Sequence, residues 1–295
     1  MDLVLQILIN GLQAGAVYVL FAVGLTLIFG VMKIVNFAHG ELYTGAAFTT
    51  FAVITWGQTN TDLPIGVLYI AALGASVIVM GVLGWLMYEL LFKRFTGDLI
   101  SGLLVAVGLA LALQTTYRFM FGSSPKRVPP LVSGRFTVLG ASITYQRLTV
   151  LVLAVVATVL LAWYLKQSRL GIALRAVSED HEAAQLQGIN YRRVSASGFV
   201  LGAILASVAA VLIAPTTITH PTIGVDLLMK GFIIIILGGL GSIVGAIYAG
   251  FLLGLIESAA STLINVTFAT ILLFVAVIVV LIFRPEGLMG NVDNS

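Results

Sequence analysis

The sequence has 295 residues, of which 60% are hydrophobic and only 9% are charged, and its formal net charge is +3. Soluble domains average roughly 25% charged residues, so this composition excludes a water-soluble globule and predicts a surface that faces lipid. The sequence contains no cysteine, which excludes disulfides and thiolate catalysis, and its basic residues form no aromatic-interleaved patch of the kind that binds nucleic acid.

Long apolar segments favour helices over alternating strands, because only helices and closed barrels pair every backbone group in lipid. The predicted fold class is therefore all-α, a polytopic bundle of transmembrane helices in a single domain of residues 1–295. With about 20 apolar residues per crossing, the candidate spans are about 3–32, 37–56, 64–92, 98–121, 148–166, 195–214, 226–238, 242–262 and 267–283. The seventh is short enough to be a half-helix joined to the eighth, so we expect eight or nine spans.

Basic residues predict which loops face the cytoplasm, since short cytoplasmic loops carry an excess of lysine and arginine. The residues expected on that side are Lys93, Arg94, Lys166, Arg169, Arg175, Arg192, Arg193 and Arg284. This pattern predicts an outside N-terminus and an inside C-terminus. The segment 122–147 conflicts with it, because it would lie outside and yet is basic. Its basic residues are Lys126, Arg127, Arg135 and Arg147.

Small residues four apart recur on several predicted helices and would let helix backbones approach closely in lipid. The pairs are Gly11 and Gly15, Gly198 and Gly202, Gly241 and Gly245, and Gly250 and Gly254. They predict a tightly packed bundle without indicating what it does.

Polar side chains inside the spans are candidate functional groups, because ionisable residues in the membrane are costly and usually face the bundle interior. Asn36, His39 and Glu41 lie where the first span gives way to the second, and they either brace an irregular turn or line a pathway. Glu257, in the eighth span, is expected to be a buried carboxyl bonded to a neighbouring helix rather than a proton carrier. No metal site is expected, since no other histidine or acid stands at ligand spacing from His39.

The longest hydrophilic segment on the predicted inner side, about 167–194, predicts a short surface helix. Ser178 can cap its start, and Gly188 can take the left-handed conformation that ends a helix, which would bring Ile189 back onto Ala184. Acidic side chains would lie in its positive first turn. These are Glu179, Asp180 and Glu182.

Small side chains on this helix leave its backbone accessible. Ala183 and Ala184, with Leu186, would let the surface of another protein approach closely, and the flanking spans would transmit its movement. The alternative is an ordinary amphipathic connector that lies on the membrane.

A glycine-rich break follows the seventh span, at Gly238, Gly239, Gly241 and Ser242. Broken helices can place the positive ends of half-helices near the midplane, where an anionic group of a ligand binds. The break therefore indicates either a site for a ligand carboxylate or a glycine contact with a neighbouring subunit.

Four motifs occur in order along nearly the whole chain. They are residues 24–30 with 35–41 (GLTLIFG and VNFAHGE), 182–188 (EAAQLQG), 237–245 (LGGLGSIVG) and 284–288 (RPEGL). The second is similar to the Glu-Ala-Ala-x-x-x-Gly loop of permease subunits in ATP-binding-cassette importers. Together the four resemble the branched-chain amino acid permease family, the LivH class, although 122–147 contains no landmark of that family.

The resemblance implies a division of labour among subunits. This chain would form a translocation pathway in a bacterial-type inner membrane with a second, LivM-like permease. Two cytoplasmic ATPase subunits would bind ATP and Mg, and an extracytoplasmic solute-binding protein would deliver the solute. The loop at about 167–194 would couple to an ATPase, and the residues implied are Glu182, Ala183, Ala184, Leu186 and Gly188.

An absence in the sequence agrees with this division. No Gly-x-x-x-x-Gly-Lys-Ser/Thr phosphate loop occurs, so this chain is expected to bind no cofactor itself and not to be an enzyme. Nor do a nucleophile, a base and an orienting acid form a recognisable catalytic set.

Two alternatives stay open. A proton-coupled secondary transporter would use His39, Glu41 or Glu257 and would work without an ATPase. Within the importer class, relatives of this family also carry urea, short amides or aromatic acids, so branched-chain and other hydrophobic amino acids are one substrate class among several.

Overall fold

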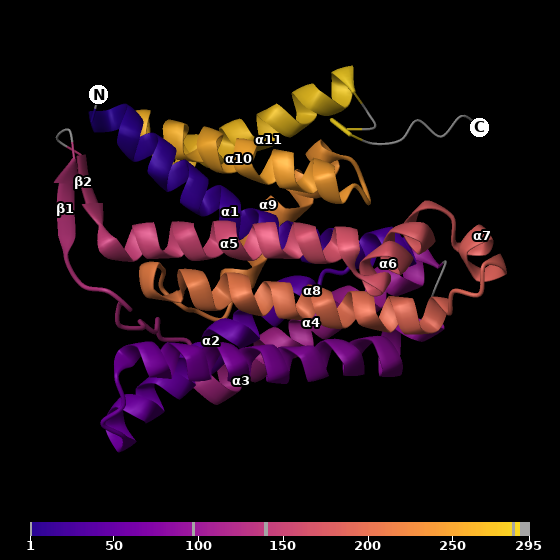
Figure 1. Ribbon diagram of the computed structural model, residues 1–295, viewed down its shortest axis with the longest axis horizontal. Helices are drawn as coiled ribbons and strands as arrows, with labels where there is room; N and C mark the ends of the chain where they lie inside the picture. Colours follow the sequence, from indigo (N-terminus) through magenta and orange to yellow (C-terminus); the bar gives the residue numbers. More distant parts are fainter. Residues whose placement is uncertain (1, 96–97, 139–140, 285–286, 290–295) are drawn as a thin grey trace.

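The computed structural model describes residues 2–95, 98–138, 141–284 and 287–289. Within these residues the fold is helical apart from one short hairpin, which confirms the predicted all-α bundle (Figure 1). The α-helices are α1 (Asp2–Met32), α2 (His39–Asn60), α3 (Ile65–Leu86), α4 (Leu99–Phe121), α5 (Tyr145–Gln167), α6 (Arg169–Glu179), α7 (His181–Leu186), α8 (Tyr191–Ile213), α9 (Ile223–Gly238), α10 (Ile243–Leu263) and α11 (Val266–Phe283). The shorter elements are η1 (Met87–Leu91), η2 (Phe92–Arg94) and η3 (Ala214–Thr216), with β1 (Arg135–Val138) paired antiparallel to β2 (Ala141–Thr144).

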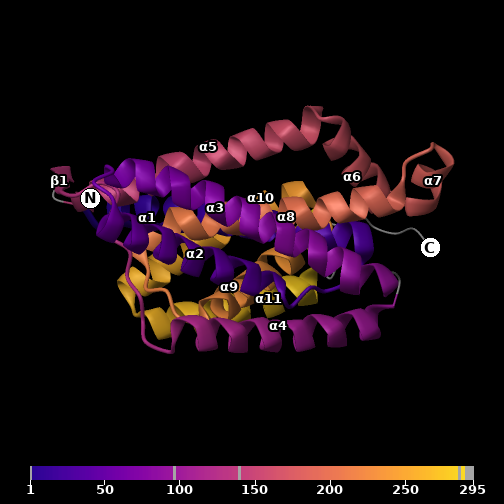
Figure 2. The same ribbon diagram turned by 90° about the horizontal axis from the view of Figure 1, so that it is seen from below.

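Most of the helices lie along one long axis of the molecule. The N-terminus of α1 and the β1–β2 hairpin lie at one end, whereas α6 and α7 lie at the other (Figure 1). The basic residues predicted to be cytoplasmic lie in η2, in α6 and in the adjoining ends of α5 and α8, which gather at the α7 end, except for Arg284, which directly follows α11. Following that prediction, we call the α7 end the inner end and the hairpin end the outer end. Seen from below, α4 and α5 run along opposite edges of the bundle (Figure 2).

Helix α1 forms the centre of the bundle, with 94% of its most apolar window buried by the rest of the chain. It packs closely on α10, because a Cβ added to Gly11 or Gly15 would come within 2.9 Å of the α10 backbone. On the α10 side, Gly250 and Gly254 face α1 in the same way. These two glycine pairs therefore serve as the close-approach ridges that the sequence predicted.

Seven helices in the described part of the chain are long and apolar enough to cross a membrane. The prediction of eight or nine spans is too high by this measure, because α2 and α9 do not qualify. Helix α9 has 16 residues and is about 24 Å long, shorter than the ~30 Å hydrocarbon core. Helix α2 has 22 residues but carries polar side chains, several of which the protein itself buries. Thr50 is one of them, and its hydroxyl lies 3.3 Å from that of Ser76 on α3.

The basic segment 122–147 makes specific contacts at the outer end. Lys126 and Thr219 exchange backbone hydrogen bonds of 2.8 and 2.9 Å, and the Lys126 ammonium lies 5.7 Å from the centroid of the Phe51 ring. Arg147 donates to Oδ1 of Asn10 on α1 at 3.1 Å. Two of the basic residues that conflict with the topology rule therefore have structural partners at this end of the bundle.

Candidate functional site

The inner loop contains two helices, α6 and α7, rather than the one that the sequence predicted. Ser178 lies inside α6, where its hydroxyl donates to the Arg175 carbonyl, so its prediction as the cap was wrong. Asp180 caps α7 instead, and its Oδ1 accepts from the backbone N–H groups of Glu182 at 2.9 Å and Ala183 at 3.0 Å. A carboxylate satisfies two of the free donors at the start of this helix and favours its dipole.

The predicted end of α7 is confirmed. Gly188 has a φ of +81°, and its N–H donates to the Gln185 carbonyl at 2.9 Å. The N–H of Ile189 reaches back to the Ala184 carbonyl at 3.1 Å, which completes a Schellman ending. The left-handed conformation required here favours glycine over any side chain with a Cβ.

Helix α7 projects beyond the ends of the long helices (Figures 1 and 2), and most of its residues are exposed. Glu182, Ala183 and Leu186 are exposed, Leu186 to 87%, but Ala184 is only 5% exposed and belongs to the core of the bundle. The expectation that Ala184 meets a partner protein was therefore wrong, because α7 turns that side chain toward its own chain. Leu186 is the large apolar side chain that the helix offers outward.

The inner loop is tied to the end of the central helix. The ammonium of Lys33, just beyond α1, donates to the Ser178 carbonyl at 3.3 Å, and the Tyr191 hydroxyl at the start of α8 donates to the Val31 carbonyl at 3.1 Å. A cavity of about 220 Å³ lies between α7 and these residues. The inner loop is therefore bonded to the end of α1 on both sides of α7, at Ser178 in α6 and at Tyr191 in α8.

The predicted polar cluster lies at the turn between α1 and α2, and Asn36, His39 and Glu41 are at most 2% exposed. Oδ1 of Asn36 accepts from the backbone N–H of Ala38 at 3.0 Å, and Nε2 of His39 lies 3.3 Å from the Phe21 carbonyl oxygen. This geometry supports bracing of an irregular turn, because all three side chains are buried and two of them are bonded to backbone groups of α1 or of the turn itself.

Removing the Asn36 amide should therefore lower stability before it alters transport. In Asn36→Leu the Ala38 N–H loses its partner in a buried turn, a change that costs about 1–3 kcal/mol. We expect a lower midpoint of thermal unfolding in detergent, while Asn60→Leu, at the exposed end of α2, leaves it unchanged. Altered solute preference at normal stability would instead place Asn36 on the pathway.

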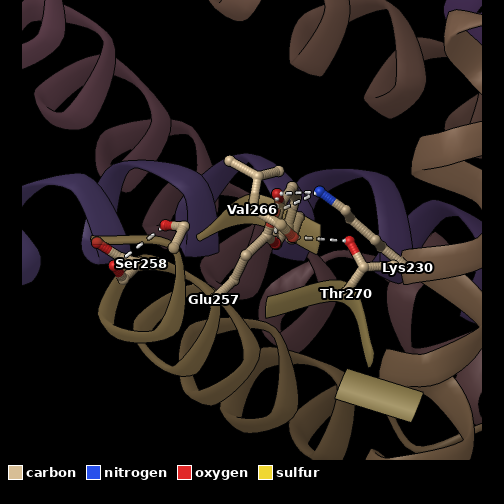
Figure 3. A network of polar contacts seen from close by, with 7 residues as sticks. Lys230, Glu257, Ser258, Val266 and Thr270 are labelled. Carbon is tan, nitrogen blue, oxygen red and sulfur yellow. Dashed lines mark hydrogen bonds and ion pairs between the residues drawn. The ribbon is translucent and has the colours of Figure 1, made fainter. Parts of the chain in front are cut away.

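Glu257 has partners on two other helices (Figure 3). Its Oε2 accepts from the Tyr18 hydroxyl of α1 at 2.8 Å, as expected of a carboxyl bonded to a neighbouring helix, and its Oε1 lies 2.7 Å from Nζ of Lys230 on α9. Lys230 also donates to the Tyr18 hydroxyl at 2.8 Å. Sequence reasoning missed Lys230, although a lysine within an apolar helix was a usable signal.

The glycine-rich break forms a turn at the inner end rather than a gap at the midplane. Gly241 lies beside Gly30 at the end of α1, and Ser242 caps α10 by accepting from the N–H of Gly245 at 3.1 Å. The carbonyls of Leu237 and Gly238 accept hydrogen bonds from residues 288 and 289. The predicted midplane site for a ligand carboxylate is therefore wrong, because the chain itself occupies this position.

At the outer end, residues from the segments 125–130 and 215–223 line a cavity of about 950 Å³. Arg127 and His220 are among its lining residues, beside several prolines. The sequence held no landmark for this cavity, which forms because the Lys126–Thr219 pairing holds two distant loops together.

The comparison with known families decides the class of this chain. The family described as "Branched-chain amino acid transport system / permease component" matches residues 7–283, which cover nearly all of the helices above. The chain belongs to this permease family. The resemblance read from the four motifs is thereby confirmed.

Individual relatives agree with the family match. BraD of Pseudomonas aeruginosa, a high-affinity branched-chain amino acid transport system permease protein, is 34% identical to this permease over 97% of this chain and 96% of its own length. LivH of Escherichia coli K12, which has the same description, is 33% identical with the same coverage. A probable LivH permease of Methanocaldococcus jannaschii is 26% identical over 92% of this chain.

Two landmarks of the permease family that are far apart in sequence meet in the structure. The N–H of Leu288, in the C-terminal motif, donates to the carbonyl of Leu237, in the glycine-rich motif, at 2.8 Å. A Cβ on Gly287, whose φ is +81°, would lie 2.6 Å from the backbone nitrogen of Gly239. Pro285 and Glu286 of the same motif lie outside the described residues.

Proposed function

We propose that this chain is the permease subunit of an ATP-driven importer for branched-chain amino acids in a bacterial-type inner membrane. The family match supports the transport role, and the projecting helix α7 carries the proposal for ATP coupling. Its exposed Leu186 and the small, exposed Ala183 form a surface that the described chain leaves uncovered and that a cytoplasmic ATPase could contact.

The mechanism follows from the contacts of the inner loop. Closure of two ATPase subunits on ATP and Mg would push α7, and the bonds from Lys33 and Tyr191 would pass this movement to the end of α1. Because α1 packs on α5, α8, α9 and α10, its displacement would repack the centre of the bundle. Access to the pathway would then change from one side of the membrane to the other.

The proposal assigns the remaining parts to partners. A second, LivM-like permease would complete the pathway, and an extracytoplasmic solute-binding protein would dock at the outer end, where the cavity beside Arg127 and His220 opens. This chain would bind no nucleotide of its own.

The purified chain by itself should therefore show no ATPase activity. Hydrolysis should appear only when the partner ATPases are added, and an assay of phosphate release with the chain alone and with the reconstituted complex checks this. A preparation proven free of partner ATPases that still hydrolyses ATP would contradict the assignment.

The function itself is tested by leucine uptake in proteoliposomes that contain the complete importer, its binding protein and internal ATP. We expect uptake that requires ATP and all subunits. Uptake by this chain alone, driven by a pH gradient, would establish the secondary transporter instead.

A further inference from the structure

Three polar side chains from three helices meet inside the bundle. Tyr18 and Lys230 lie near the middle of α1 and α9, and Glu257 lies in the last third of α10; the three are here called the ion-pair cluster. Their mutual distances are 2.7–2.8 Å, and the Lys230 ammonium also lies 4.9 Å from the centroid of the Tyr18 ring. Both charges are thus held in place by a group on the central helix.

The ion-pair cluster is partly exposed at the surface of the chain. The side chains of Lys230 and Glu257 are 26% and 21% exposed, and Asp226, one turn before Lys230, is also exposed. Residues four apart on a helix share a face, so α9 presents acid and base together on one side. Charges at this depth are too costly to face hydrocarbon, so this side must meet water or protein.

The three members of the ion-pair cluster leave some of their hydrogen-bond donors and acceptors available to a ligand. An ammonium has three N–H donors, and Lys230 uses two of them, on Tyr18 and Glu257. Each carboxylate oxygen of Glu257 accepts one bond within the cluster and keeps a further lone pair. A ligand that supplies one carboxylate and one ammonium can therefore join the cluster without breaking it.

We propose that the ion-pair cluster is a transient binding point for the zwitterionic head group of the transported amino acid. The carboxylate of the solute would bind the free donor of Lys230, and its ammonium would bind the carboxylate of Glu257. This inference rests on the proposed function. Because each charge of the cluster is already partly neutralised, binding is weak, as a pathway requires if the solute is to leave again.

The test uses a cysteine as a reporter, since the natural chain has none. In the complete importer without ATP, Asp226→Cys should react with a membrane-impermeant, cationic methanethiosulfonate reagent. At about ten times its half-protecting concentration, leucine should slow this reaction about tenfold by simple occupancy. The 2-oxo acid of leucine, which lacks the ammonium, should protect far less.

A matched control is Leu160→Cys on α5, which is 57% exposed on the outer surface of the bundle and should not react. If Asp226→Cys also fails to react, its face is covered and the inference is overturned. Reaction without protection by leucine overturns it as well.

The cluster itself is tested by removing both charges in Lys230→Met/Glu257→Gln, combined with Asp226→Cys. Replacing a whole ion pair by neutral groups of similar size is often tolerated, so the importer should still assemble and the cysteine should still react. Leucine protection should be lost. Protection that survives would show that the cluster only joins helices. Leucine uptake by the unaltered importer tests the proposed function separately, so the two can fail independently.

Discussion

Leu186→Glu should leave the permease inserted and folded but should abolish ATP-driven uptake. Leu186 is 87% exposed and makes little contact with its own chain, so the folded state loses almost nothing. A charge placed in a protein interface at a dominant contact costs about 2 kcal/mol or more, roughly a 30-fold loss of affinity. Uptake in proteoliposomes and co-purification of the ATPases measure the effect.

The matched control is Leu263→Glu. Leu263 is a similarly exposed leucine (62%) and is the last residue of α10. It should keep both uptake and ATPase binding. Normal uptake and normal ATPase retention in Leu186→Glu would reduce α7 to a connector. Ala184→Arg is a poorer test, because Ala184 is buried and the change would disturb the packing of α7 itself.

Gly188→Val tests the same helix, α7, by straining the backbone at its end. No atom lies within 4 Å of a Cβ at Gly188, so the strain comes from its φ of +81° alone. A left-handed conformation costs a residue with a Cβ roughly 1–2 kcal/mol. We expect reduced uptake without loss of insertion.

Gly254→Leu should prevent the permease from folding into a stable bundle. A Cβ at Gly254 would press on the backbone of Gly15 and Gly11, which cannot move aside as a flexible side chain would. Overpacking in a core costs about 1–3 kcal/mol, and more where backbone must shift. The monodisperse fraction in size-exclusion chromatography and the midpoint of thermal unfolding should both fall sharply.

Gly74→Leu on α3 serves as the control, since nothing lies within 4 Å of a Cβ at that position. Its side chain would enter open space, and the protein should remain monodisperse. Equal behaviour of the two variants would mean that α1 and α10 do not pack through their glycines.

Local chemistry accounts for what was predictable in the inner loop. The ending at Gly188 follows from one residue that tolerates positive φ, and it was predicted correctly. The start of α7 was not predicted correctly, because Ser178 and Asp180 are both good N-terminal caps. The choice depends on α6, which extends through Ser178 and leaves Asp180 as the first free residue. The direction of Ala184 likewise depends on how α7 lies against the bundle.

The sequence by itself determined that the surface of this protein faces lipid, that the fold is helical, to which family the chain belongs and which glycines join α1 to α10. These properties depend on hydropathy, backbone pairing and side-chain size, which act over a few residues. Only the tertiary structure decided the number of long apolar helices, the position of the glycine-rich turn and the partners of Glu257. Tyr18 and Glu257 are 239 positions apart, and Lys230 and Glu257 are 27 apart. Such polar pairs form only when separate helices have packed, since no local pattern states which helix faces will meet.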